Sequence, residues 1–254
     1  EQYDNSGKQV MFGSEKVKGI LLALDASEET ITELLNNGYN VIVTHHPLFF
    51  KSFKCINDEE FQSKLLLKLI DKRISLYSAH TPLDKMYYDK LALSLDVQVH
   101  DIIFRDESYG DVNENIGYGV YGKLQDKTVV SEFLFRVKDK LCIEHVTYGG
   151  DEKKEITNVV LLYGAGGRKI PSVINRYAVD CIVTGDVGYH EMKYAIDSGV
   201  VVVDAGHYAT EKILLDFLLE DIQDYLTKSL SSNEVQVSIA RTEKNPFKVT
   251  VLYE

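Results

Sequence analysis

The sequence predicts an α/β protein built from two similar α/β modules with mainly parallel or mixed sheets. Three observations support this fold class. Apolar runs of strand length alternate with helical segments, short patterns of the first half recur in the second half, and polar residues follow strand ends in both halves. Strands that alternate with helices are typical of a parallel sheet covered by helices.

The first module is expected to span residues 1–104. Ser27 is a suitable N-cap for its first helix, and Gly38 is a suitable end for that helix. The expected elements, in chain order, are a strand at 18–25, a helix at 27–38, a strand at 40–44, a helix at 59–73 and a strand at 74–80. This βαβαβ series indicates a mainly parallel sheet.

The second module, expected at residues 105–206, begins with a change of character. The stretch from Asp106 to Gly122 is polar, glycine-rich and poorly periodic, so it is a candidate linker. Residues 207–254 are expected to complete the fold across both modules. The expected elements are strands at 117–124, 145–148, 156–164, 179–185, 200–206, 235–240 and 247–253, and helices at 129–141, 168–178, 190–199 and 210–230.

Two short patterns repeat in the same order in both halves. "NVIVTHH" corresponds to "DCIVTGD", and "SAHTPLDK" corresponds to "DAGHYATEK". Each copy of the second pattern has a histidine just past a strand and a carboxylate four residues later, which gives the pairs His80–Asp84 and His207–Glu211. The repeat indicates one module used twice.

The composition excludes several classes of partner. The formal net charge of −11 argues against a broad nucleic-acid footprint and against binding to an anionic membrane. The longest apolar runs are strand-sized, far shorter than a membrane span. The three cysteines form no CxxC pair, which fits a reducing compartment. We therefore expect a cytoplasmic protein.

Candidate metal ligands lie at or just past the strand ends. In parallel α/β sheets ligands bind beyond the carboxyl ends of the strands. The adjacent histidines of "VTHHP" precede Pro47, which ends the strand, so both side chains could reach one cluster where the backbone turns. The candidate ligands are His45, His46, Asp84, His207 and Glu211.

This set of five side chains suits two metal ions better than one. A catalytic zinc with an open position takes fewer protein ligands, whereas two ions about 3.5–4 Å apart can share five. Imidazole and carboxylate together favour divalent transition metals: Zn, Fe, Mn, Co or Ni. The alternative is that the histidines are strand-end architecture and hold no metal.

Two further histidines and one loop have open roles. His190 and His80 could shuttle protons beside the metal cluster, or they could be structural. The loop "YGAGGRK" follows a strand and precedes a helix, so Gly164, Gly166 and Gly167 could hold a phosphate. The loop matches neither common phosphate-binding motif, and a tight β-to-α turn explains it equally.

The motifs "YDNSGKQV", "VTHHPLFF", "SAHTPLD", "VTGDVGYHE" and "AGHYATE" together resemble the GTP cyclohydrolase 1 type 2 homologues, also called NGG-interacting-factor-three-like proteins. The resemblance implies two intertwined α/β repeats, a dinuclear metal site between them and a ring-shaped homo-hexamer. It implies the same five metal ligands that spacing indicates. Tyr189-His190 departs from the two histidines of many relatives.

Two functions follow from these expectations, and the sequence leaves both open. The first is metal-dependent hydrolysis, in which an activated water attacks a small molecule. The family name implies a nucleotide-type substrate, GTP. The second is a metal-binding, metal-delivery or regulatory protein without turnover.

Overall fold

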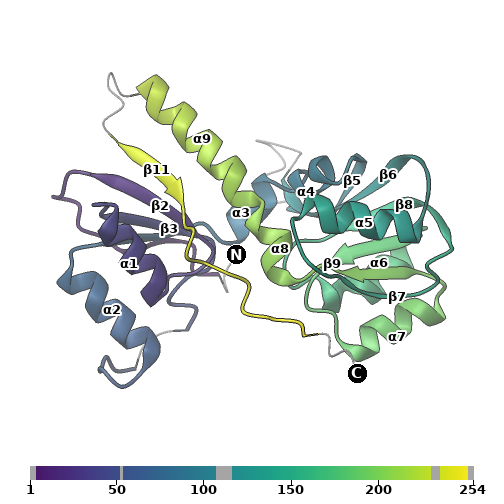
Figure 1. Cartoon of the computed structure of the whole chain (residues 1–254), viewed down its shortest axis with the longest axis horizontal. Coiled ribbons are helices and arrows are strands. Elements are labelled where there is room, and N and C mark those ends of the chain that lie inside the picture. Colours follow the sequence, from purple (N-terminus) through teal and green to yellow (C-terminus); the bar gives the residue numbers. More distant parts are fainter. Residues whose placement is uncertain (1–3, 52–53, 107–115, 230–234, 251–254) are drawn as a thin grey trace. The chain divides into compact units, whose positions relative to one another are not determined.

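The computed structural model describes residues 4–51, 54–106, 116–229 and 235–250, and it forms two compact units (Figure 1). One unit contains residues 1–83 and 214–244, and the other contains residues 84–213 and 245–254. Each unit has a mixed β-sheet with helices packed against it.

The first unit is built on a sheet with the strand order β1-β4-β3-β2-β11. The inner strands are parallel, and β1 is antiparallel to β4. The strands are β1 (Gly7–Val10), β2 (Gly19–Ala23), β3 (Val41–Thr44), β4 (Ser75–Ser78) and β11 (Gln236–Ile239), and the helices are α1 (Glu28–Asn36), α2 (Phe61–Asp71) and α9 (Leu214–Ser229). Helix α3 (Thr81–Met86) contains the division between the units.

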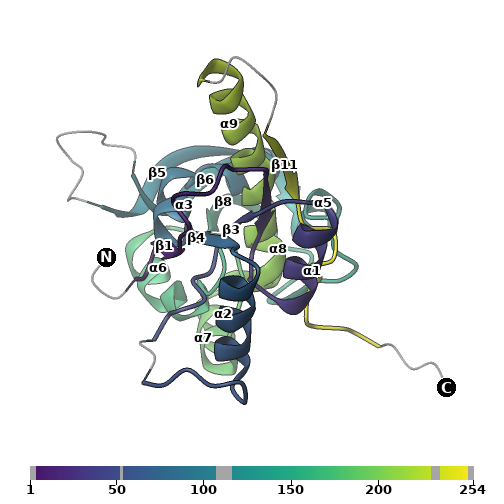
Figure 2. The same cartoon turned by 90° about the vertical axis from the view of Figure 1, so that its left-hand side faces the viewer.

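The core of the first unit lies between its sheet and the helices α1 and α2 (Figures 1 and 2). Leu21 of β2 and Ile42 of β3 pack with Ile31 of α1 and Leu65 of α2, and all four are fully buried. The predicted N-cap of α1 is confirmed: the Ser27 hydroxyl accepts the Thr30 amide in a capping box. These contacts hold β2 and β3 in place, and they therefore also set the positions of the polar residues that follow the two strands.

The second unit has the strand order β5-β6-β8-β9-β10-β7. Its strands are β5 (Val97–Arg105), β6 (Gly117–Val129), β7 (Thr147–Gly149), β8 (Glu155–Leu161), β9 (Cys181–Thr184) and β10 (Val201–Asp204). Its helices are α4 (Lys90–Ser94), α5 (Val130–Lys140), the 3-10 turn η2 (Gly167–Lys169), α6 (Ile170–Arg176), α7 (Tyr189–Asp197) and α8 (His207–Lys212). Ile182 and Val202 pack with Val173 and Ala195 in its core.

The predicted repeat is visible in the two sheets. β1-β4-β3-β2 in the first unit has the same order and directions as β7-β10-β9-β8 in the second, with one antiparallel edge strand beside three parallel strands. Thr44 and Thr184, which end the matching patterns, occupy corresponding registers opposite Ser78 and Asp204. The sequence patterns therefore mark equivalent strand ends.

The structure divides elsewhere than the predicted module boundary at residue 104. β5 pairs with β6 in the second sheet, and the chain from Asp84 to Ile213 belongs to the second unit. The predicted helix at 210–230 is in fact two helices, α8 and α9, separated at Ile213. The division between the units falls at the same break, since α8 belongs to the second unit and α9 to the first.

Two other expectations differ from the structure. The candidate linker 106–122 becomes strand β6 from Gly117 onward, while 107–115 lies outside the described residues. A Cβ at Gly117 or Gly122 would lie 2.6 Å from a main-chain oxygen of β5, so these glycines permit close strand approach. The closing strand at 247–253 is absent from the described part, 247–250, where Phe247 and Val249 are exposed.

Among the described residues, no helix has both the length and the apolar character that a membrane span needs.

Candidate functional site

The first unit gathers three histidines beyond the ends of β3 and β4. His45, His46 and His80 each offer a ring nitrogen, and these nitrogens lie within 4.8 Å of one another. The His45 amide donates to the Ala23 carbonyl (3.0 Å) and the His46 amide to the Leu24 carbonyl (2.8 Å). The chain therefore stays bonded to the neighbouring strand while both adjacent side chains reach the cluster.

Hydroxyl groups hold the turn that follows these histidines. Thr44 Oγ1 donates to the His46 carbonyl at 2.8 Å, and Ser78 Oγ donates to the same carbonyl at 3.2 Å. Both hydroxyls are buried at the strand ends. The turn after β3 is thus held by one hydroxyl from β3 and one from β4.

Two of these histidines each have an aspartate carboxylate within hydrogen-bond distance of the ring nitrogen Nδ1. His46 Nδ1 lies 3.0 Å from Asp25 Oδ1, and His80 Nδ1 lies 2.7 Å from Asp4 Oδ1. A neutral imidazole that donates from Nδ1 has its lone pair on Nε2. In metal sites, a histidine ligand commonly donates its other ring N–H to a carboxylate, a main-chain carbonyl or water. The arrangement fits two imidazoles that are oriented for a metal ion.

Protonation states in the first unit also suit a cation. Burial opposes the ionisation of Asp4, but hydrogen bonds from Ser6, Thr81 and His80 outweigh it and lower its pKa to about 2. Burial lowers the pKa of His80, although Asp4 acts in the opposite direction. At neutral pH the aspartate is ionised and the imidazole neutral, as metal ligation requires.

The second unit holds a histidine between two carboxylates. His207 is the first residue of α8; its Nδ1 lies 2.8 Å from Asp186 Oδ2, and its Nε2 lies 3.0 Å from Glu211 Oε2. Glu211 follows one helical turn later and is 4% exposed. The four-residue spacing His207–Glu211 therefore forms a preoriented pair in which the carboxylate is buried and the imidazole is partly exposed.

Asp84 lies close to this pair within the second unit. One of its carboxylate oxygens is within 4.8 Å of one of Glu211, and both residues are buried. The pKa of the Tyr118 phenol is raised by its partial burial and by the negative charges of Asp84 and Glu211. Two carboxylates this close are favourable when a cation lies between them.

The glycine loop after β8 packs against the same helix. A Cβ on Gly164 would lie 1.9 Å from Glu211 Oε1 and 3.1 Å from His207 Nε2, and Gly164 has φ +50°. The amide of Gly164 donates to Thr210 Oγ1, that of Gly166 to the Gly164 carbonyl, and that of Gly167 to the Gly185 carbonyl. These partners favour the tight turn over a phosphate loop.

His190 lies in the first turn of α7 and is exposed, with its ring edge-on to Tyr189 at a centroid distance of 5.3 Å. Its role as a proton shuttle stays a prediction. His80, the other proposed shuttle, lies among the first-unit imidazoles and is placed to act as a ligand as well.

The sequence did not predict the aspartates that lie within hydrogen-bond distance of these histidines. Asp186 occupies the place of His46 in the repeated pattern, and Asp25 is the last residue of the first predicted strand, so both had a positional signal. Asp4 had none beyond its motif, since it acts on a histidine 76 residues away.

In metal-free protein, His207 is expected to make stability depend on pH. Its hydrogen bond with Glu211 raises the pKa of His207 to about 9, helped by Asp186 and opposed by burial. A group whose pKa is higher in the folded state than in the unfolded state stabilises the fold. This stabilisation is complete below the unfolded-state pKa of about 6.5 and is lost as the pH rises through the folded-state pKa. As the pH rises from 6.5 to 9.5, the thermal unfolding temperature of the wild type should therefore decrease, and that of His207→Gln should decrease less. An equal decrease in the two proteins would contradict this.

Comparison with protein families matches residues 1–246 to the family described as Duf34/NIF3 (NGG1p interacting factor 3). The chain is 30% identical over 251 residues to a Clostridium acetobutylicum protein named GTP cyclohydrolase 1 type 2 homolog, covering 98% of this chain and 92% of the relative. It is 30% identical over 212 residues to the Helicobacter pylori protein named GTP cyclohydrolase 1 type 2, covering 84% and 80%.

A solved structure of a Bacillus cereus protein related to NIF3 has a similar fold. It matches with a TM-score of 0.89 at 22% identity, over 98% of this chain and 94% of that one. Identity at this level shows a shared fold alone.

Proposed function

The chain belongs to the Duf34/NIF3 family, and on this premise we propose that it binds two divalent transition-metal ions and uses them to hydrolyse a nucleotide-type substrate. The proposed ligands are His45, His46, Asp84, His207 and Glu211.

The observation that carries the proposal is the set of histidine–aspartate pairs. His46, His80 and His207 each have Nδ1 within 3.0 Å of an aspartate oxygen. A carboxylate behind the imidazole raises its basicity and fixes its tautomer. Strand-end architecture alone gives no reason for the same pairing in both units.

Each group has a role in the proposed reaction. The two ions would supply Lewis acidity and a water that is deprotonated near neutral pH. His46 and His207 would hold them with orientations set by Asp25 and Asp186. His80, neutral at pH 7, or the exposed His190 would pass protons to and from the substrate.

A nucleotide is proposed as substrate because the Helicobacter pylori relative is named a GTP cyclohydrolase. The amides of Gly164, Gly166 and Gly167 are not assigned to its phosphates, because they donate within the protein. We propose further that the chain acts in the cytoplasm as a homo-oligomer, a hexamer by family resemblance.

One observation favours the second candidate function, metal storage or delivery. His207 Nε2 and Glu211 Oε2 lie 3.0 Å apart and form an ion pair when the imidazole is protonated. A metal ion must displace the proton that this pair holds, so loading and release would depend on pH. Such exchange suits a carrier that does not catalyse a reaction.

Turnover separates the two candidates. Protein loaded in turn with Zn, Mn, Fe or Co is expected to hydrolyse at least one nucleoside triphosphate of a panel that includes GTP, with products measured by chromatography. The rate should depend on the metal and vanish with a chelator. Full metal loading without any hydrolysis would contradict the enzyme and support the carrier.

A further inference from the structure

The chain after β11 is bonded to the end of β2. The parallel pairing of β11 with β2 ends where the Ala240 amide donates to the Leu22 carbonyl at 2.8 Å. Beyond this point Glu243 accepts the next two amides: its Oε2 lies 2.9 Å from Leu24 N, and its Oε1 lies 2.8 Å from Asp25 N. One carboxylate thus takes the place of two main-chain carbonyls.

The opposite edge of the same β2 extension carries the adjacent histidines. The Ala23 and Leu24 carbonyls accept the amides of His45 and His46, and the Asp25 carboxylate bonds His46 Nδ1 at 3.0 Å. The segment 23–25 therefore lies between Glu243 on one edge and two proposed ligands on the other.

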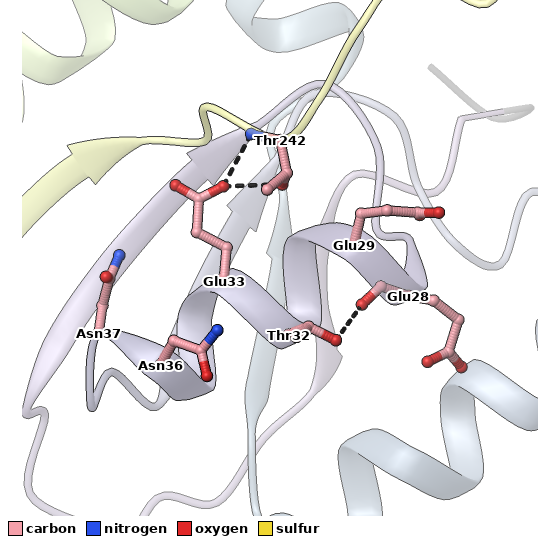
Figure 3. Close-up of a pocket in the computed structure, with 7 residues that line it drawn as sticks. All are labelled: Glu28, Glu29, Thr32, Glu33, Asn36, Asn37 and Thr242. Carbon is pink, nitrogen blue, oxygen red and sulfur yellow. Dashed lines mark hydrogen bonds between the residues drawn. The ribbon is translucent and has the colours of Figure 1, made fainter.

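A second glutamate anchors the same C-terminal segment at a different place. Glu33 of α1 accepts the Arg241 and Thr242 amides at 3.0 and 2.9 Å and the Thr242 hydroxyl at 2.7 Å. Figure 3 shows this contact in a groove along α1, lined by Glu28, Glu29, Thr32, Glu33, Asn36, Asn37 and Thr242. No hydrogen bond of Glu33 to segment 23–25 occurs among the described residues, so this side chain tethers the segment without holding Asp25.

We propose that Glu243 is a positioning residue of the metal centre. It fixes the backbone of Leu24 and Asp25, and Asp25 in turn holds the His46 imidazole in its metal-binding orientation. The inference rests on the proposed function, because it assigns Glu243 to that same centre. It predicts that the segment after β11 affects the coordination geometry of one of the two ions, the one that His46 would bind.

Co²⁺ is the probe, since its visible absorption reports ligand geometry. The affinity and the spectrum of bound Co²⁺ are measured for the full-length wild type, Glu243→Ala, Glu243→Gln and the control Glu33→Ala. Glu243→Ala should weaken one Co²⁺ by about tenfold or more and change the spectrum, as for loss of a group that orients a ligand. Glu243→Gln keeps one acceptor and should lie between, and it replaces Glu243→Ala if that variant does not fold.

Glu33→Ala should lower the unfolding midpoint without changing the Co²⁺ spectrum. Wild-type affinity and spectrum in the folded Glu243 variants would overturn the inference alone. Equal losses in Glu33→Ala and Glu243→Ala would also overturn it, because tethering would then be the cause. Absence of Co²⁺ binding by wild type would instead overturn the proposed function, and the inference with it.

Discussion

Glu211→Gln is expected to lower the bound metal from about two ions per chain to one or fewer and to reduce hydrolysis on the order of 100-fold or more. Glu211 is 4% exposed, and its two oxygens face His207 and Gly164. Glutamine keeps the shape of the side chain but removes the negative charge that Glu211 would contribute as a metal ligand. The same change should bring the pKa of His207 down, because Glu211 is the main cause of its rise.

The matched control is Glu220→Gln, which removes the same charge from an exposed position on α9. It should leave metal content and hydrolysis at wild-type values. Metal content is measured by mass spectrometry on protein purified without chelators, and hydrolysis by product formation. Two ions per chain in Glu211→Gln would show that this carboxylate is not a ligand.

Gly164→Ala is expected to displace the Glu211 side chain and to lose metal as well as stability. The new Cβ would lie 1.9 Å from Glu211 Oε1, and the residue has φ +50°. A left-handed backbone costs a residue with a Cβ about 1–2 kcal/mol, and forcing an extra carbon into a packed site adds about 1–3 kcal/mol. The free energy of unfolding should therefore fall by about 2–5 kcal/mol.

Gly199→Ala separates the two contributions. Gly199 has φ +73°, and a Cβ there would meet nothing within 4 Å. This variant should lose only the backbone cost of about 1–2 kcal/mol and keep its metal. Denaturant unfolding and metal analysis on both variants give the comparison. Equal losses of stability and full metal content in Gly164→Ala would contradict the close packing of this loop on the ligand.

The central strands and most helices were predictable, because their residues carry a strong apolar pattern. β2, β3, β9 and β10 are short, mostly apolar strands, and none of them contains an exposed residue. The edge strand β1 was not predicted because only Val10 in it is strongly apolar. Its formation depends on antiparallel pairing with β4, which local sequence does not encode.

The candidate ligands were predictable from position, whereas their partners were not. The repeat marked the four-residue spacings His80–Asp84 and His207–Glu211 directly. The aspartates behind the histidines depend on contacts between residues far apart in the chain. Glu243 is the extreme case, since it bonds amides 218 and 219 residues away. Such partners emerge only when the fold brings the strand ends together.

The metal content of the wild-type chain tests the central claim most directly. Untagged protein, purified without chelators, is analysed by mass spectrometry before and after incubation with Zn, Mn, Fe or Co. The proposed dinuclear centre predicts about two transition-metal ions per chain. A value near zero that no added metal restores would contradict the centre, and the histidines would then be strand-end architecture.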